Sequence, residues 1–342
     1  MLKLWKVLVA WTHWRTLLAA TWRFLVAVFD WRTVLRRVKG QPLVDTVFVT
    51  NMRDKTDRRR YLGLWRPKSG HFNGPRYWIN GTVGRTRALD IVTEDLYTSE
   101  GRQKAKDYFI DAVQWAKGNG AKVILLAAST KRLFGEDANQ LRKLFPDLTF
   151  TIGDNGTFYL LREETLRALE NAGLKPGHCR IAILGPYGFL GEMMIEALIK
   201  KGYDIIGAGP NISALKRITA KYGIDTYRTF AEMNAVDAVV ACTHSKKIRL
   251  TAESVKLIRR PNRKLLVIDV AEPSNLKYRE FQRCKEVVIR QDAGNAYSPK
   301  LKYVLGAISY RMFRLTRGVT FGCFAEALSI ASEIKQGKEV EA

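Results

Sequence analysis

The sequence predicts an α/β protein whose second half forms a doubly wound parallel sheet, preceded by a smaller α/β domain and by a basic, Trp-rich N-terminal helix. Three observations support this fold class. Apolar strands alternate with helices after Arg180, a glycine-rich turn follows the first of these strands, and residues 1–40 differ in composition from the rest of the chain. Alternating strands and helices are typical of parallel sheets, because each crossover between parallel strands requires a long connection.

Residues 1–40 contain five tryptophans among leucine, valine and alanine, and basic residues interrupt the apolar runs. No uninterrupted apolar run reaches the roughly 18 residues that a membrane-spanning helix needs, and no small-residue cleavage site follows an apolar core. The segment is therefore expected to be an interfacial or partner-binding helix. It either binds an anionic membrane surface or packs on the body of the protein or on a second subunit.

Residues 41–175 are expected to form the smaller α/β domain, which would carry the substrate. The dipeptide Asn80-Gly81 is typical of a tight hairpin turn. The expected strands are Leu43–Thr50, Lys122–Ala128 and Leu148–Ile152, and the expected helices are about Ser99–Ala116, Gly135–Phe145 and Tyr159–Asn171.

Residues 176–300 are expected to form the doubly wound domain, and residues 301–342 a C-terminal helical segment. The domain's strands are predicted within RIAILG, YDIIGAG, AVDAVVACT, KLLVIDVA and EVVIRQD. Between the second and third strands, Asp225–Tyr227 is followed by a short helix predicted around Phe230–Asn234. The connecting helices are predicted at about Gly188–Lys201, Ile212–Tyr222 and Ala252–Ile258. From Lys302 to Glu333 the sequence predicts mostly helix.

The turn after the first strand of the doubly wound domain, in Arg180–Gly191 (RIAILGPYGFLG), contains Gly185, Gly188 and Gly191. In a dinucleotide-binding Rossmann unit, such glycines permit a sharp turn, close approach to a pyrophosphate and tight packing of the helix on the sheet. The helix N-terminus attracts the pyrophosphate. Because a strand precedes this turn and a helix follows it, we expect it to bind a nicotinamide cofactor. The alternative is a packing turn without a ligand.

The second strand of this domain ends at Gly209-Pro210-Asn211, without the Asp or Glu that holds a ribose 2′-hydroxyl in NAD sites. Asn211, Lys216 and Arg217 instead leave room for a 2′-phosphate. NADPH is therefore the expected cofactor, with NADH as the alternative. The competing interpretation is that Lys216 and Arg217 form a solvated helix face.

Two groups of residues are candidates for the chemistry. Cys323 begins a predicted helix, where the positive end of the helix dipole favours a thiolate, although a cysteine between apolar residues is more often part of the core. The segment Cys242–Ser245 follows a predicted strand, at the edge where ligands bind. There His244 is a candidate acid or base, or a hydrogen-bond partner of a substrate carbonyl, although a loop histidine more often has a structural role. Thr243 is a candidate contact to the cofactor. Asp269, after the next strand, is expected to shape its loop.

The formal net charge of +24 attracts acidic partners. No nucleic-acid motif is present, so nucleic-acid binding is not expected. The four cysteines and four histidines lack metal-ligand spacing, so no metal site is expected, and cysteines without close pairing favour a reduced, cytoplasmic setting. The protein is therefore expected to be cytoplasmic, either free or peripheral to the inner face of a membrane.

Four ordered stretches resemble the long-chain acyl-[acyl-carrier-protein] reductases, the fatty-aldehyde-forming enzymes of cyanobacteria. They are FTIGDNGTFYLL, GPYGFLGE, VIDVAEPSNL and FGCFAEAL, which begin at Phe150, Gly185, Val267 and Phe321. The resemblance covers about residues 88–333 and implies a divergent member of that family.

The resemblance implies NADPH-dependent reduction of a fatty acyl thioester to a fatty aldehyde. Cys323 would form the acyl-enzyme, and the donor would be a thioester of acyl carrier protein or coenzyme A. The residues by themselves leave two alternatives. One is a noncovalent NAD(P)-dependent oxidoreductase of a small carbonyl or alcohol, and the other is a nucleotide-binding, membrane-associated module without enzymatic activity.

Overall fold

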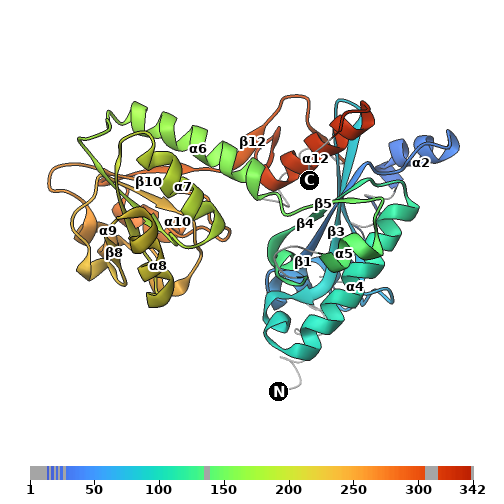
Figure 1. Ribbon diagram of the computed structural model, residues 1–342. Helices are drawn as coiled ribbons and strands as arrows, with labels where there is room; N and C mark the ends of the chain where they lie inside the picture. Colours follow the sequence, from blue (N-terminus) through green and yellow to red (C-terminus); the bar gives the residue numbers. More distant parts are fainter. Residues whose placement is uncertain are drawn as a thin grey trace, which may run out of the picture. The chain divides into compact units, whose positions relative to one another are not determined.

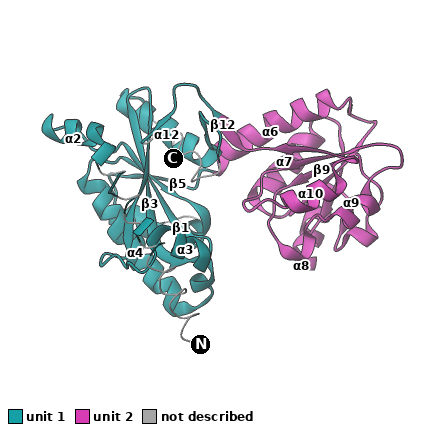
Figure 2. Ribbon diagram, turned by 180° about the vertical axis from the view of Figure 1, so that it is seen from behind, with its two compact units in different colours: residues 1–153, 297–342 teal, residues 154–296 magenta. Residues whose placement is uncertain are grey.

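The computed structural model describes residues 14, 17–18, 21, 24–25, 28–134, 139–304 and 315–339. The chain forms two compact units (Figure 2): unit 1 comprises residues 1–153 and 297–342, and unit 2 comprises residues 154–296. Unit 2 is therefore inserted into the sequence of unit 1. Each unit has its own six-stranded sheet, so the predicted α/β class with two sheet domains is confirmed.

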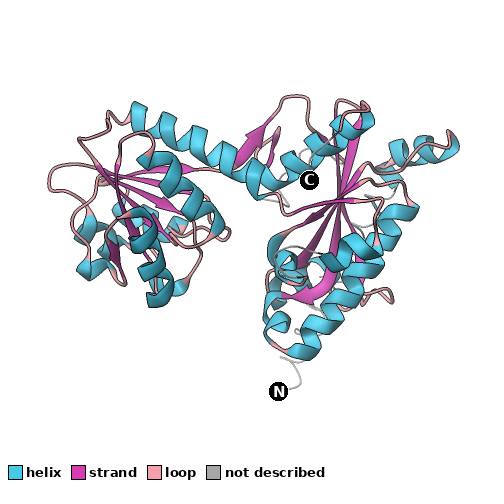
Figure 3. Ribbon diagram, viewed as in Figure 1, coloured by secondary structure: helices cyan, strands magenta, loops and turns pink. Residues whose placement is uncertain are grey.

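Unit 1 contains a mixed sheet, whose strands are drawn as arrows in Figure 1 and in magenta in Figure 3. Its strand order is β13-β2-β3-β1-β4-β5. The pairs among β3, β1, β4 and β5 are parallel, whereas β2 is antiparallel to both of its neighbours. The strands are β1 (Thr46–Met52), β2 (His71–Ile79), β3 (Thr82–Val92), β4 (Val123–Leu126), β5 (Thr149–Thr151) and β13 (Lys302–Tyr303). The helices are α2 (Trp31–Val38), α3 (Lys55–Leu62), α4 (Ser99–Gly118), α5 (Asn139–Leu144) and α12 (Gly322–Lys335), with 3₁₀ turns η1 (Thr93–Tyr97) and η2 (Ala128–Arg132).

Strands β2 and β3 form a hairpin around the predicted Asn80-Gly81 turn. Both turn residues have positive φ, 47° at Asn80 and 81° at Gly81, as a two-residue turn of type I′ requires. The two strands are longer than the sequence indicates. Arg76, Arg85 and Arg87 are buried within them, and buried charges hide the apolar alternation by which strands are recognised.

Helices cover both faces of the sheet in unit 1. Val47 and Val49 of β1 belong to the same buried cluster as Phe109 of α4. Phe48, which lies between the two valines, belongs to the opposite cluster and stacks on Phe324 of α12 with ring centroids 4.2 Å apart. The alternation follows from the two-residue period of a strand. α12 is therefore part of the core of unit 1, although it follows unit 2 in the chain.

Unit 2 contains a wholly parallel sheet with the order β11-β10-β9-β6-β7-β8. Alternate residues of β6 belong to two buried clusters, so this sheet is also covered on both faces. The strands are β6 (Arg180–Leu184), β7 (Asp204–Ala208), β8 (Thr226–Tyr227), β9 (Ala238–Ala241), β10 (Leu265–Asp269) and β11 (Val288–Asp292). The helices are α6 (Asp154–Asn171), α7 (Phe189–Ile199), α8 (Ile212–Tyr222), α9 (Ala252–Ile258) and α10 (Tyr278–Cys284), with 3₁₀ turns η3 (Phe230–Glu232) and η4 (Lys246–Ile248).

The two units differ from the predicted domains in their boundaries. The sequence places residues 154–175 in the smaller α/β domain, but α6 contributes Leu161 and Leu169 to the core of unit 2. The sequence also predicts a separate helical segment at residues 301–342, whereas these residues belong to unit 1. The prediction of mostly helix from Lys302 is wrong in part, because β13 and β14 (Val319–Phe321) precede α12. A further short strand, β12 (Asn295–Tyr297), spans the boundary between the units.

The predicted N-terminal helix falls partly outside the described residues. Within them, α2 and all described positions from 14 to 29 are helical. No helix in the described part of the chain is long and apolar enough to cross a membrane.

Candidate cofactor site

The strand order of unit 2 reverses at β6. The chain runs outward from β6 to β7 and β8 and then returns to β9 on the other side of β6. At such a point the loops that leave the two central strands diverge, and the crevice between them is where open α/β sheets bind ligands. The glycine-rich turn follows β6 and the segment Cys242–Ser245 follows β9, so the two predicted groups flank this crevice.

Gly185 and Gly191 are required by the packing of the turn itself. A Cβ atom on Gly185 would lie 2.7 Å from Cβ of Thr243, and the φ of Gly185 is +77°. A Cβ atom on Gly191 would lie 2.2 Å from the carbonyl oxygen of Gly185. Because neither position has room for a side chain, the two glycines allow the turn, the start of α7 and the loop after β9 to meet.

Gly188 is different, because nothing in the protein crowds its missing side chain. A Cβ atom there would meet no atom nearer than the carbonyl oxygen of Gly185, at 3.5 Å, and the residue is exposed. Gly188 is the N-cap residue of α7, and no side chain among the described residues caps this helix end. An exposed glycine beside uncapped N–H groups is suited to the close approach of a pyrophosphate.

The rest of the turn packs against the end of β7. A Cβ atom on Gly207 would lie 3.0 Å from Cγ of Pro186, and one on Gly209 would lie 2.7 Å from Cε1 of Tyr187. Gly207 in β7 and Gly209 just after it therefore provide the space that the two bulky turn residues fill. This contact explains how a turn with proline and tyrosine between its glycines fits on the sheet.

Asn211, a predicted cofactor contact, is the N-cap residue of α8. Its Oδ1 accepts hydrogen bonds from the N–H of Ala214 (3.2 Å) and from the hydroxyl of Ser213 (2.9 Å). Capping is a common structural role for asparagine at this position. The role of Asn211 in cofactor binding stays a prediction.

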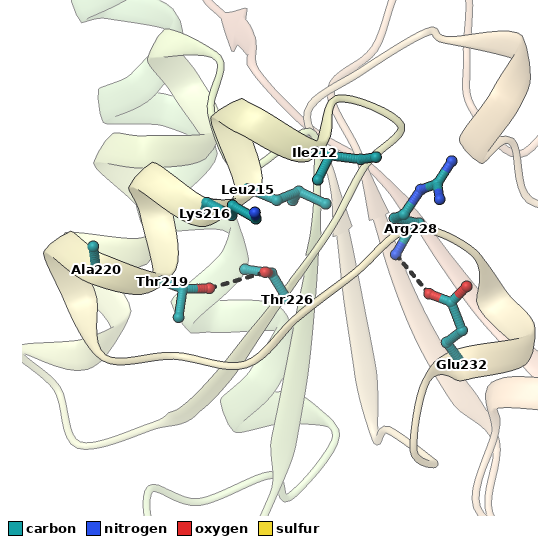
Figure 4. Close-up of a pocket in the computed structure, with 8 residues that line it drawn as sticks. All are labelled: Ile212, Leu215, Lys216, Thr219, Ala220, Thr226, Arg228 and Glu232. Atoms are coloured by element: carbon teal, nitrogen blue, oxygen red, sulfur yellow. Dashed lines mark hydrogen bonds between the residues drawn. The ribbon is translucent and has the colours of Figure 1, made fainter.

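Two basic side chains, Lys216 of α8 and Arg228 after β8, line a groove of about 440 Å³, which Figure 4 shows with the other lining residues. Arg217, which the sequence offers for a 2′-phosphate, points elsewhere and pairs with Glu192 of α7 at 3.4 Å. Lys221 pairs with the same carboxylate at 2.7 Å. Lys216 forms no ion pair with any described residue, so its charge is available to an anion.

Asn275 holds the loop after β9 in place. The side chain is fully buried, and its Nδ2 donates hydrogen bonds to the carbonyl oxygens of Thr243 (2.7 Å) and Ile248 (3.1 Å). Its Oδ1 accepts a hydrogen bond from the N–H of Leu250 (2.8 Å). Sequence reasoning misses this role, because the partners are 25 to 32 residues away along the chain.

His244, a candidate acid or base, is exposed and follows Thr243 at the same edge of the sheet. Its carbonyl oxygen accepts a hydrogen bond from Nη2 of Arg249 at 3.1 Å. The structure thus brings Gly185, Thr243 and His244 to one edge, while the chemical roles of Thr243 and His244 stay predictions. No cluster of three or more His, Cys, Asp and Glu side chains in the described ranges could hold a metal ion.

Burial raises the pKa values of two ionisable groups behind this edge, Asp269 and Cys242. Desolvation raises the pKa of Asp269 to about 6, although hydrogen bonds from the N–H groups of Leu276 (3.0 Å) and Ala271 (3.1 Å) oppose the shift. These bonds show that Asp269 shapes its loop, as the sequence predicts. Burial, and to a lesser extent the charge of Asp269, raises the pKa of Cys242 to about 12. The Cys242 thiol is therefore protonated at neutral pH and is a poor nucleophile.

Cys323, the predicted nucleophile, lies in unit 1. α12 begins at Gly322, so the predicted position of Cys323 at the start of a helix is confirmed. The side chain is half-buried against a cluster that includes Phe48 and Tyr77. A Cβ atom on Gly153 would lie 2.2 Å from Cβ of Cys323. Such apolar packing is typical of a core cysteine, and the role of Cys323 as a nucleophile stays a prediction.

Residues 168–289 match the family model for shikimate / quinate 5-dehydrogenase. The matched segment contains the glycine-rich turn, the loop after β9 and the loop after β10, which surround the crevice. Unit 2 is an NAD(P)-binding domain like that of the shikimate and quinate dehydrogenases. The protein is an NAD(P)-dependent oxidoreductase whose substrate is not established. The match covers less than half of the 342 residues, so it does not extend to unit 1.

Two solved structures align with most of this chain at low similarity. Shikimate dehydrogenase from Aquifex aeolicus is 12% identical, with 87% of this chain and 94% of that chain covered and a TM-score of 0.41. L-tryptophan dehydrogenase from Nostoc punctiforme is 10% identical, with 86% and 84% covered and a TM-score of 0.42. No curated protein matches the chain. With TM-scores below 0.5, these structures carry no inference about the activity of this protein.

The resemblance to long-chain acyl-[acyl-carrier-protein] reductases is wrong. The family model that matches the cofactor domain is that of shikimate / quinate 5-dehydrogenase, and the match includes the stretches at Gly185 and Val267 on which the resemblance partly depends. Glycine-rich turns and loops of this kind occur in many Rossmann domains, because the same pyrophosphate imposes the same geometry. The thioester substrate, the fatty aldehyde product and the carrier implied by that resemblance therefore lose their support.

Proposed function

We propose that the protein is an NADP(H)-dependent oxidoreductase that acts on a small carbonyl or alcohol without a covalent intermediate. The observation that carries the proposal is the approach of Gly185 to Thr243 where the strand order reverses, beside the exposed Gly188. Gly185, Gly188 and Gly191 would hold the pyrophosphate against the N-terminus of α7. The bound nicotinamide would supply or accept the hydride.

The charges near the end of β7 favour NADP(H) over NAD(H). The end of β7 has no carboxylate to hold a ribose 2′-hydroxyl, since Gly209, Pro210 and Asn211 follow it. Lys216 and Arg228 line the adjoining groove, and a 2′-phosphate placed there would meet two cations. We therefore propose Lys216 and Arg228 as the 2′-phosphate contacts in place of the Arg217 that the sequence suggests, because Arg217 already pairs with Glu192.

His244 is the residue proposed to move the substrate proton. Reduction of a carbonyl requires a proton at its oxygen, and oxidation of an alcohol requires removal of that proton. An imidazole can both donate and accept a proton near neutral pH. His244 is exposed at the carboxyl edge of the sheet, directly after the Thr243 that packs on Gly185.

The first test measures the binding of NADPH and NADH to the full chain by calorimetry, followed by turnover with a panel of small carbonyls and alcohols. NADPH should bind at least about tenfold more tightly than NADH, a difference of roughly 1.4 kcal/mol. Lys216→Glu should abolish this preference, whereas Lys256→Glu, the same charge change on the exposed face of α9, should retain it. Equal binding of both cofactors to the parent would contradict the NADP(H) assignment. Tight binding without turnover of any carbonyl or alcohol would instead favour a nucleotide-binding module.

A further inference from the structure

Helix α2 attaches to the body of unit 1 by its polar side. Asp30, which precedes the helix, is buried and pairs with the guanidinium groups of Arg76 and Arg85. Arg36 donates hydrogen bonds to the carbonyl oxygens of Pro42 (2.7 Å) and Gly81 (3.0 Å). These contacts hold the arginine-bearing side of the helix against the hairpin of β2 and β3.

The opposite, apolar side of α2 faces solvent. Trp31, Val34, Leu35 and Val38 follow helical spacing, and their exposed fractions are 55%, 57%, 44% and 79%. α2 has no buried residue. Figures 1 and 2 both show the helix projecting from the edge of unit 1. A surface helix normally turns its apolar side inward, so this reversed arrangement indicates that another apolar surface covers α2.

Most of the described apolar residues before α2 are also exposed. Those more than half exposed are Trp14, Leu17, Leu18, Phe24, Val28 and Phe29. Exposed apolar side chains are therefore not confined to α2.

The charge of the segment decides which surface covers it. Residues 1–38 contain seven Lys and Arg but a single acidic residue, Asp30, which is already paired inside unit 1. Two copies of this protein meeting through the segment would place cations beside cations and could form no ion pair between the helices. Anionic lipid headgroups supply the missing negative charge, and Arg37 and Lys39 are exposed at the end of the helix to meet them.

We propose that the exposed apolar side of α2, together with the described exposed apolar residues before it, lies in the interface of an anionic membrane. The apolar side chains would enter the boundary between headgroups and acyl chains, and Trp31 would sit at headgroup level. The helix would lie parallel to the membrane plane, with Asp30 fixing it to unit 1. This proposal does not depend on the proposed reaction or its substrate.

The test is flotation of the full-length protein with vesicles. Vesicles of phosphatidylcholine with phosphatidylglycerol should carry the protein, and vesicles of phosphatidylcholine alone should carry much less, with the difference shrinking as salt rises. Val34→Glu combined with Val38→Glu should lower partitioning roughly a hundredfold, since each buried Val side chain contributes about tenfold or more. Neither side chain is buried, so the fold should be retained.

The matched control combines Leu257→Glu with Tyr278→Glu, two residues 57% and 70% exposed on unit 2, which add the same charge. The control should float like the parent. An equal loss of binding in both variants would mean that net charge alone directs binding, and would overturn the proposal. It would also be overturned if the parent ignores anionic vesicles but forms a dimer that Val34→Glu with Val38→Glu dissociates, because a second copy would then cover the helix.

Discussion

At the scale of single residues, Gly188 and Gly191 separate cofactor binding from packing. A methyl group on Gly188 meets no protein atom nearer than 3.5 Å, whereas one on Gly191 would lie 2.2 Å from the Gly185 carbonyl oxygen. Gly188→Ala should therefore leave the free energy of unfolding within about 1 kcal/mol of the parent and weaken NADPH binding at least about tenfold. Gly191→Ala should lower stability by about 2 kcal/mol or more.

Denaturant unfolding and cofactor titration of both glycine variants check this pair of predictions. The two variants should give different results. Gly191→Ala should lose stability, whereas Gly188→Ala should lose only affinity for NADPH. If Gly188→Ala binds NADPH as tightly as the parent, the turn does not hold the pyrophosphate in the way proposed.

His71 makes stability depend on pH. It is buried, its Nδ1 accepts a hydrogen bond from Nε of Arg87 at 2.7 Å, and desolvation, with the charge of Arg87 second, lowers its pKa from 6.5 to about 4. Between these pH values the unfolded chain binds a proton that the folded protein does not. The contribution of His71 is therefore present above pH 6.5 and is lost as the pH falls towards 4, by about 3 kcal/mol.

The measurement is urea unfolding from pH 7 to pH 4, compared with His71→Asn, whose Oδ1 can accept the same hydrogen bond without titrating. The parent should lose more stability than the variant across this range. Asp269 acts in the opposite direction, since its raised pKa of about 6 favours the folded state at lower pH. It is present in both proteins and cancels in the difference. Parallel pH profiles would show that His71 is not held neutral by the fold.

At the scale of elements, the first turn of α12 contains Cys323, and its substitution can show whether the reaction needs a covalent step. Cys323 at its start packs against Gly153 and the aromatic cluster of unit 1. For a noncovalent oxidoreductase, Cys323→Ala should keep turnover within about a factor of three of the parent, because the substitution removes no reacting group. Native Cys323 should also react with iodoacetamide much more slowly than the same residue in the urea-unfolded chain, as peptide mass spectrometry would show. Loss of all turnover in a folded Cys323→Ala protein would contradict the noncovalent mechanism.

At the scale of the whole molecule, each unit has a separate hydrophobic core, and unit 2 holds the proposed cofactor site. Calorimetry should therefore show two unfolding transitions. NADPH should raise the midpoint of the unit 2 transition, corresponding to about 2.7 kcal/mol at a free concentration of 100 times Kd. Limited proteolysis during heating would assign each transition to its unit. An equal shift of both transitions would show that the units unfold together.

Much of unit 2 could be predicted from the sequence, because the relevant signals are local. Helices α8 and α9 agree with their predicted limits at both ends, and β6 leads into the glycine-rich turn as expected. Strand alternation, the glycine spacing and the missing carboxylate after β7 all lie within short windows. The same local signals are shared by many Rossmann domains, which is why they predict a cofactor domain yet support a wrong family.

By itself, then, the sequence determined the α/β class, the position of the cofactor turn and the basic, Trp-rich character of the N-terminal segment. Only the tertiary structure decided that Lys216 rather than Arg217 is available to a 2′-phosphate, that Asn275 fixes Thr243, and that α12 completes the core of unit 1. It also decided that α2 turns its apolar side outward. The physical reason is that each of these outcomes depends on partners distant in the chain, whereas periodicity and turn chemistry depend on neighbours.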